Sequence, residues 1–98
     1  MGAREDLMRR LTAEADGCYS WSNGPGYRYR AHTHPYEKVL YCVDGSITFV
    51  LEDTGRERRL GPGDRLVVPP GTSHSALVGE RGVTCIEGRG KGAGRGVN

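Results

Sequence analysis

The sequence has no long apolar run, no paired cysteines and little imbalance of charge, and each absence excludes a class of protein. No stretch approaches the ~20 apolar residues that cross a bilayer, so a transmembrane helix is not expected. The N-terminus lacks the basic-then-apolar pattern of a signal peptide, and we therefore expect a cytoplasmic protein that does not act at membranes. Cys18, Cys42 and Cys85 are far apart and odd in number, which argues against a disulfide framework and a zinc knuckle.

Positive charge is concentrated at one end of the chain. The 98 residues include 14 lysines and arginines and 12 acids, for a formal net charge of +2 at pH 7. Residues 88–98 contain Arg89, Lys91 and Arg95 but no acid, so the rest of the chain is nearly neutral. A near-neutral body gives no sign of nucleic-acid binding. Residues 88–98 are also rich in glycine without apolar periodicity, which predicts a disordered tail.

Two kinds of local pattern divide the remaining chain. In residues 1–17, Leu7, Met8 and Leu11 share one face and Gly17 follows, which predicts a short helix over 4–15. From residue 18 to 87, β-branched and aromatic runs alternate with Gly, Pro and Asp, as is typical of an all-β sandwich or barrel. The predicted strands are 18–21, 27–32, 38–43, 46–52, 57–60, 65–68, 74–78 and 83–87.

Two details of these strands carry structural predictions. Asp44-Gly45 fits a two-residue hairpin turn, because both residues tolerate positive φ. Residues 38–43 are apolar on both faces, which in an antiparallel sheet implies that both faces are covered. One face meets the interior, and the other meets either the N-terminal segment or a second subunit. We favour a homodimer.

The three histidines of the chain are spaced as if they belong to one site. His32 and His34 lie at positions i and i+2, and in a strand such positions point to the same face. His74 comes from a separate strand, after the turn Pro69-Pro70-Gly71. Together they could hold one divalent transition metal ion, and three imidazoles favour Zn, Fe, Ni or Cu over oxygen-preferring ions.

The surroundings of the histidines resemble the two sequence motifs of the cupin family. The first motif is matched at every spacing by Gly26, His32-Thr33-His34 and Gly45, and the second by Gly63, Pro69-Pro70-Gly71 and His74. The resemblance extends over residues 26–78. It implies a small antiparallel β-barrel or jelly roll over residues 18–87, with the metal ligands His32, His34 and His74.

Two positions depart from the family pattern. The second motif ends in Val78 rather than Asn, and Lys38 replaces the glutamate that commonly binds the metal, with Glu37 one residue earlier. Strand alternation points Lys38 inward and Glu37 outward, unless a bulge at Pro35 turns Glu37 into a fourth ligand. An inward Lys38 would be neutral, extend to the barrel mouth or pair with an acid such as Glu37. Alternatively, the barrel is metal-free and Lys38 binds an anion.

Further residues are candidates for contact with a small molecule. Lys38, Arg30 and Tyr36 are the catalytic candidates. Arg30 lies two positions before His32, so strand alternation predicts that both side chains point to the same face. This direction suits Arg30 to bind a substrate carboxylate. An apolar pocket below the ion is predicted from Leu40, Cys42, Leu66, Val68 and Val78. Strand alternation places Tyr27, Tyr29 and Tyr41 on the face opposite to the site, which predicts that they pack rather than react.

The sequence leaves several functions open. The first hypothesis is a metal-dependent protein that acts on a small molecule, with dioxygenase-like and isomerase-like chemistry both compatible with the fold. The second is a non-catalytic module that binds or stores a small ligand and needs no metal. The third is a sensor subunit whose partner is another protein.

Overall fold

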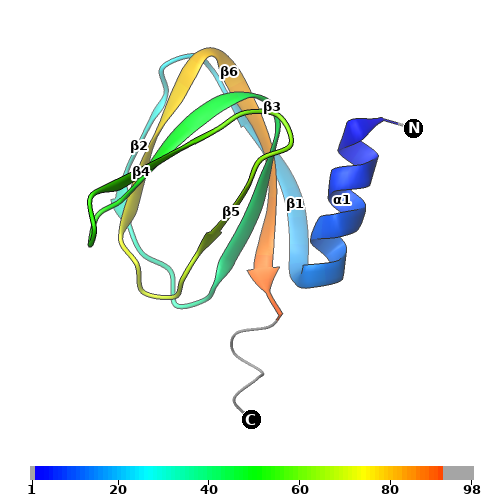
Figure 1. Cartoon of the computed structure of the whole chain (residues 1–98), viewed down its shortest axis with the longest axis horizontal. Coiled ribbons are helices and arrows are strands. Elements are labelled where there is room, and N and C mark those ends of the chain that lie inside the picture. The colour runs from blue at the N-terminus through cyan, green and yellow to red at the C-terminus, as the bar shows by residue number, and fades with distance from the viewer. Residues whose placement is uncertain (1, 92–98) are drawn as a thin grey trace.

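Residues 2–91, which the computed structural model describes, form a jelly roll of antiparallel strands preceded by one helix (Figure 1). The all-β prediction with a short N-terminal helix is confirmed. No helix in this part of the chain is long and apolar enough to cross a membrane. The elements are α1 (Ala3–Glu14), β1 (Ala15–Asn23), β2 (Arg28–His32), β3 (Lys38–Leu51), β4 (Arg56–Leu60), β5 (Arg65–Val68) and β6 (His74–Gly90).

The long strands β3 and β6 connect the two layers of the jelly roll. They pair with each other along most of their length, and both bend near the middle. On one side of the bend, β1 pairs with β6 and β5 pairs with β3. On the other side, β2 pairs with β6 and β4 pairs with β3. The two layers face each other (Figure 1), and the described strand pairings do not close into a complete barrel.

The predicted hairpin turn at Asp44-Gly45 is wrong, because the strand continues through it. The pairing of β3 with β6 shifts register on both sides of this dipeptide, which marks a bulge and a bend. Gly45 has φ +75°, and a Cβ there would lie 2.0 Å from the carbonyl oxygen of Gly82. The predicted break at 79–82 is likewise part of β6. The eight predicted strands therefore become six, because glycine permits a bend as well as a turn.

Apolar side chains form two separate clusters. The inner cluster lies between the layers and contains Leu40, Cys42, Ile47, Phe49, Leu60, Leu66, Val68, Ala76, Val78, Val83 and Cys85. The outer cluster joins α1 to the other face of β3 and β6 through Leu7, Leu11, Ala15, Val39, Tyr41 and Ile86. The N-terminal segment thus covers the second apolar face of β3, for which a second subunit is not needed.

Residues 88–91, which were predicted to be part of a disordered tail, are ordered in the structure. β6 extends to Gly90, and its last residues pair with β1 and β3. The backbone N–H of Lys91 donates to the carbonyl of Glu14, which ties this end of β6 to α1. Backbone pairing therefore orders residues 88–91 despite their lack of apolar periodicity. The remainder of the predicted tail, 92–98, lies outside the described residues.

The end of α1 is attached to the sheet by a charged group. Arg65 and the Tyr41 hydroxyl both donate hydrogen bonds to the Glu14 carboxylate. The bond from Arg65 lowers the pKa of Glu14, Tyr41 contributes in the same direction, and partial burial opposes both. Because the folded pKa is lowered, the carboxylate stabilises the fold above its ordinary pKa, and this contribution is lost as the pH falls through the folded value.

We therefore expect Glu14→Gln to lower the urea midpoint at about pH 7 and to have a smaller effect at about pH 3. The reason is that protonation removes the same interaction from the unmodified protein. Exposed Glu80 gives a matched control, since Glu80→Gln should show no such convergence. An equal loss of stability for Glu14→Gln at both pH values would contradict the assignment.

Candidate metal centre

The fold brings the three histidines of the chain together at one end of the interior. Their candidate ligand atoms all lie within 4.8 Å of one another. The ring centroids of His32 and His74 are 4.4 Å apart, and that of His34 is 4.8 Å from His32 and 5.3 Å from His74. His74 is buried, His34 is half-buried and His32 is exposed, so the cluster is reached from the mouth of the interior.

Backbone pairing explains why residues so far apart in sequence meet. His32 at the end of β2 is the direct strand partner of His74 at the start of β6. His34 lies in the loop after β2, where its carbonyl accepts a hydrogen bond of 2.8 Å from the Gly71 N–H. The Pro-Pro-Gly turn is thereby joined to the loop that carries His34. The two cupin-like motifs thus lie against each other.

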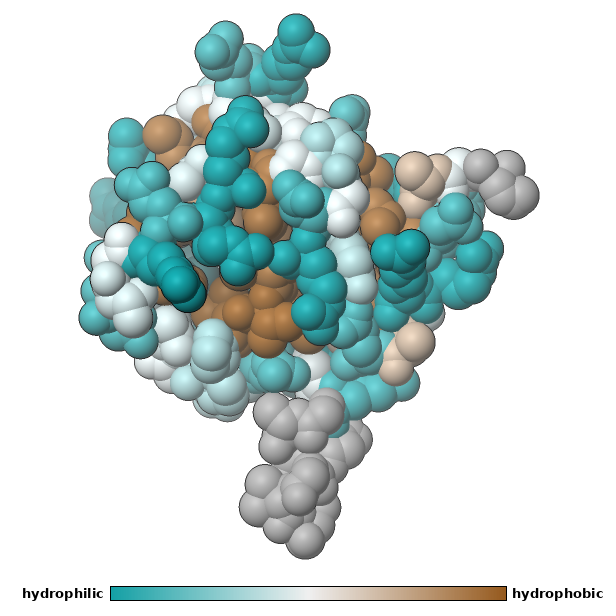
Figure 2. All heavy atoms as spheres, in the orientation of Figure 1, coloured by the Kyte–Doolittle hydropathy of each residue, from teal (hydrophilic) through white to brown (hydrophobic). Residues whose placement is uncertain are grey.

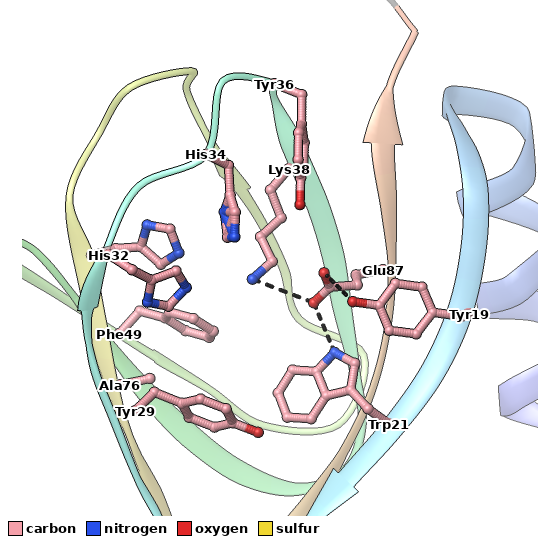
Figure 3. A pocket seen from close by; sticks show the side chains of 11 residues that line it. Tyr19, Trp21, Tyr29, His32, His34, Tyr36, Lys38, Phe49, Ala76 and Glu87 are labelled. Atoms are coloured by element: carbon pink, nitrogen blue, oxygen red, sulfur yellow. Dashed lines mark hydrogen bonds and ion pairs between the residues drawn. The ribbon is translucent and has the colours of Figure 1, made fainter.

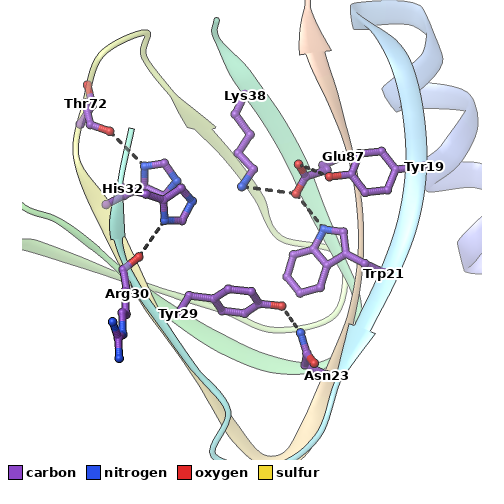
Figure 4. Close-up of polar contacts among 10 residues, drawn as sticks. Tyr19, Trp21, Asn23, Tyr29, Arg30, His32, Lys38, Thr72 and Glu87 are labelled. Atoms are coloured by element: carbon purple, nitrogen blue, oxygen red, sulfur yellow. Dashed lines mark hydrogen bonds and ion pairs between the residues drawn. The ribbon is translucent and has the colours of Figure 1, made fainter. Parts of the chain in front are cut away.

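Hydrogen bonds to the backbone orient two of the rings. The Nδ1 atoms of His32 and His74 lie 2.7 and 3.0 Å from the carbonyls of Arg30 and Thr72 (Figure 4). A carbonyl can only accept, so each Nδ1 carries the proton in a neutral ring, which leaves Nε2 with its lone pair. This is the arrangement that fixes the tautomer of metal-binding histidines.

Two buried nitrogens of the cluster have no hydrogen-bond partner among the described residues, His34 Nδ1 and His74 Nε2. A buried polar atom without a partner is costly, and such atoms are rare outside functional sites. Coordination of a metal ion by the lone pair of His74 Nε2 would remove this cost. The residues present therefore fit a transition metal ion.

The electrostatic environment favours the neutral form of His34 and His74. Burial lowers the pKa of His34 and of His74, and the positive charge of Lys38 lowers both further. The Thr72 carbonyl acts on His74 in the opposite direction but does not reverse the result. Since only the neutral imidazole can bind a metal, the lowered pKa values favour the ligand form.

Lys38 lies inside the pocket and pairs with Glu87 of β6. Its Nζ is 3.4 Å from Glu87 Oε1, and less than a tenth of either side chain is exposed. Glu87 also accepts hydrogen bonds from the Trp21 indole at 2.7 Å and the Tyr19 hydroxyl at 2.9 Å. Partial burial and the Glu87 carboxylate raise the pKa of Tyr19 to about 12, so the hydroxyl stays protonated and donates. Figure 3 shows Lys38 between the histidines and Glu87.

These polar groups line one pocket of about 270 Å³. Its remaining walls are mostly aromatic or apolar. On the face of the molecule that Figure 1 presents, Figure 2 shows an apolar area surrounded by hydrophilic residues. The complete lining is Tyr19, Trp21, Tyr29, His32, His34, Tyr36, Lys38, Phe49, His74, Ala76 and Glu87. This volume suits a small organic molecule.

A bulge in β2 changes the faces on which Tyr29 and Arg30 were expected to lie. Tyr29 pairs with Ala76 and His32 pairs with His74, so three steps along β2 correspond to two steps along β6. The extra residue places Tyr29 on the same face as His32, so Tyr29 lines the pocket as well as packing against the inner cluster as predicted. Arg30 is exposed and its side chain points away from the pocket (Figure 4), so it does not line the pocket.

The other candidates divide between the pocket and the outside. Tyr36 lines the pocket, with its ring 4.9 Å from that of His34 and beneath the Arg89 guanidinium. Glu37 is not part of the histidine cluster, and its carboxylate lies against Gly90. β3 pairs regularly from Lys38 onward, so Glu37 lies on the face of the chain opposite to Lys38. The acid that pairs with Lys38 is consequently Glu87, not Glu37.

The apolar part of the pocket also differs from expectation. Leu40, Cys42, Leu66, Val68 and Val78 belong to the packed inner cluster and do not line the pocket. Aromatic residues from β1 and β3 take that place, and no sequence motif marks them as site residues. One signal for Glu87 is present in the sequence. Val83, Cys85 and Glu87 are spaced by two residues and therefore share one face of a strand. An acid at the end of this otherwise apolar face is unusual and marks Glu87 as a candidate.

Comparison with known proteins places these motifs in a family. The model of the cupin domain matches residues 21–84. The dimethylsulfoniopropionate lyase DddQ of Ruegeria pomeroyi is 36% identical over 56 residues, which are 57% of this chain. The 3-hydroxyanthranilate 3,4-dioxygenase of Cupriavidus pinatubonensis is 30% identical over 80 residues, which are 80% of this chain. The matched regions are only 27% and 42% of these two relatives' lengths.

Solved structures of similar shape agree with the family match. The structure of DddQ from Ruegeria pomeroyi has a TM-score of 0.66 and 31% identity, covering 76% of this chain and 38% of that one. The polyketide cyclase RemF from Streptomyces resistomycificus has a TM-score of 0.67 and 26% identity, covering 74% of this chain and 52% of that one.

Proposed function

The chain belongs to the cupin family, and from this premise we propose that it binds a divalent transition metal through His32, His34 and His74 and acts on a small molecule. The observation that carries this proposal is the convergence of three imidazoles, one of them with a buried Nε2 that lacks a partner. A bound Zn, Fe, Ni or Cu ion would supply a Lewis acid next to the pocket.

The protein's own residues would hold and orient the small molecule. Lys38 offers a fixed positive charge, since Glu87 holds its ammonium from one side. Phe49, Tyr29 and Trp21 supply apolar surface that displaces water from the bound molecule. This combination of a few placed polar groups and an aromatic wall is common in small-molecule sites.

The relatives support an enzyme without selecting a reaction. One is named as a lyase, one as a dioxygenase and one as a cyclase. All three names describe chemistry on small molecules, so the likeness favours an enzyme over a storage module or a sensor subunit. The reaction itself depends on pocket residues that differ from protein to protein.

Metal content tests this function. Protein purified without chelator, or reconstituted with Zn, Fe, Ni or Cu, is expected to hold about one equivalent of metal per chain, because three imidazoles form one metal site. Elemental analysis after desalting measures it. Less than about a tenth of an equivalent of every metal after reconstitution would contradict the proposal.

Two expectations about the whole protein remain predictions. The cytoplasmic location is an expectation based on sequence patterns alone. The homodimer is expected from the second apolar face of β3, and α1 covers that face in this structure. Size-exclusion chromatography with light scattering would decide the oligomeric state.

A further inference from the structure

The pocket contains one positive charge that the histidine cluster does not explain. Lys38 is 7% exposed and projects from β3 into the interior. Among residues 2–91, Glu87 is its one ion-pair partner, at 3.4 Å. An ammonium group carries three N–H donors, and a single contact of this length leaves donor capacity that faces the pocket.

The Glu87 carboxylate is already engaged on both oxygens. Oε1 accepts from Trp21 and faces Lys38, while Oε2 accepts from the Tyr19 hydroxyl. Trp21 and Tyr19 lie two positions apart on β1, and together they hold the carboxylate against that strand. Glu87 therefore serves as the anchor of Lys38 and has little capacity left to bind a cationic ligand.

The charges of the pocket do not balance once a divalent ion is present. Three neutral imidazoles add no negative charge to the ion, and Lys38 occupies the position at which the family pattern has a carboxylate. The positive charge of Lys38 also acts on His34 and His74, so its field reaches the cluster. A pocket of low polarity strongly favours a ligand that supplies the missing negative charge.

We propose that this pocket binds a small organic carboxylate, with the carboxylate group paired to the Lys38 ammonium on the side that faces the histidines. The apolar part of the ligand packs on Phe49, Tyr29 and Trp21. This inference rests on the proposed metal-binding function and names the chemical class of its substrate.

The test compares acids with amides of the same shape. Benzoate and benzamide, and propanoate and propanamide, are titrated into the metal-loaded protein by calorimetry. A charge-assisted hydrogen bond contributes about 1.5–3 kcal/mol, so each carboxylate is expected to bind about 10- to 100-fold more tightly than its amide.

Variants connect that preference to Lys38. Lys38→Met should remove the preference while metal uptake, measured by elemental analysis, stays at the wild-type level. Lys91→Met removes the same charge just beyond the end of β6, outside the pocket, and should leave the preference unchanged. If Lys38→Met does not fold, Lys38→Met/Glu87→Gln removes both buried charges and should lose the preference equally.

The outcomes separate the two proposals. Metal uptake with equal affinity for acid and amide, or with no binding of any carboxylate, overturns the inference alone. A preference that survives in Lys38→Met, or in the double variant, also overturns it. Failure of the wild-type protein to take up metal overturns the proposed function, and the inference with it.

Discussion

Replacing His74 with alanine is expected to abolish metal binding. His74 is the most deeply buried of the three ligands, and its Nε2 is one of the two buried cluster nitrogens without a hydrogen-bond partner among residues 2–91. Loss of a residue that merely orients a ligand weakens metal affinity about 10- to 100-fold, so loss of the ligand itself should exceed about 100-fold. Elemental analysis of His74→Ala after reconstitution, and competition with a chromophoric chelator, measure the effect.

A neighbouring substitution provides the control for His74→Ala. The Nδ1 of His74 binds the backbone carbonyl of Thr72, which Thr72→Ala retains. Thr72→Ala should therefore keep full metal stoichiometry. Circular dichroism establishes whether His74→Ala is folded. A folded His74→Ala protein that still holds one equivalent of metal would show that the ligands are misassigned.

Breaking the pair between Lys38 and Glu87 is expected to be the most destabilising change to the pocket. Lys38→Met leaves a buried carboxylate that keeps its bonds from Trp21 and Tyr19 but loses its counter-charge. Removal of one partner from a buried ion pair costs about 3–5 kcal/mol, and the two remaining donors place the expected loss near ~3 kcal/mol. Urea unfolding of the metal-free protein measures this free energy.

The double variant tests the cause of that loss. Lys38→Met/Glu87→Gln removes both charges, and neutral replacements of buried pairs are often tolerated. It should therefore be more stable than Lys38→Met alone, which a double-mutant cycle expresses as a coupling energy. Additive losses would mean that the two charges do not interact. In that case Lys38 would have to be stabilised by a group other than Glu87.

Regular periodicity explains what could be predicted from the sequence. The short helix, most of the strands and the inward direction of Lys38 follow from patterns that repeat every 3.6 or 2 residues. The grouping of His32, His34 and His74 was predicted because each is placed by a motif with fixed spacing. These features depend on residues that are close together in the sequence, and their spacing can be read from the sequence directly.

Irregular backbone explains what could not be predicted. The bulge in β2 adds one residue between Tyr29 and His32, and this insertion exchanges the directions expected of Tyr29 and Arg30. The same kind of irregularity carries β3 through Asp44-Gly45 instead of ending it there. A dipeptide of this type can make a turn or a bend, and only the partner strand selects between them.

The sequence by itself determined the chemical nature of the centre: three histidines in cupin-like motifs, and a lysine where a carboxylate is common. The tertiary structure alone decided what surrounds that centre. Glu87 lies 49 positions beyond Lys38 in the chain, and the pair forms only because both strands project these side chains into one pocket. Strand register and bulges choose such partners through packing and backbone hydrogen bonds between distant segments, and no local pattern records that choice.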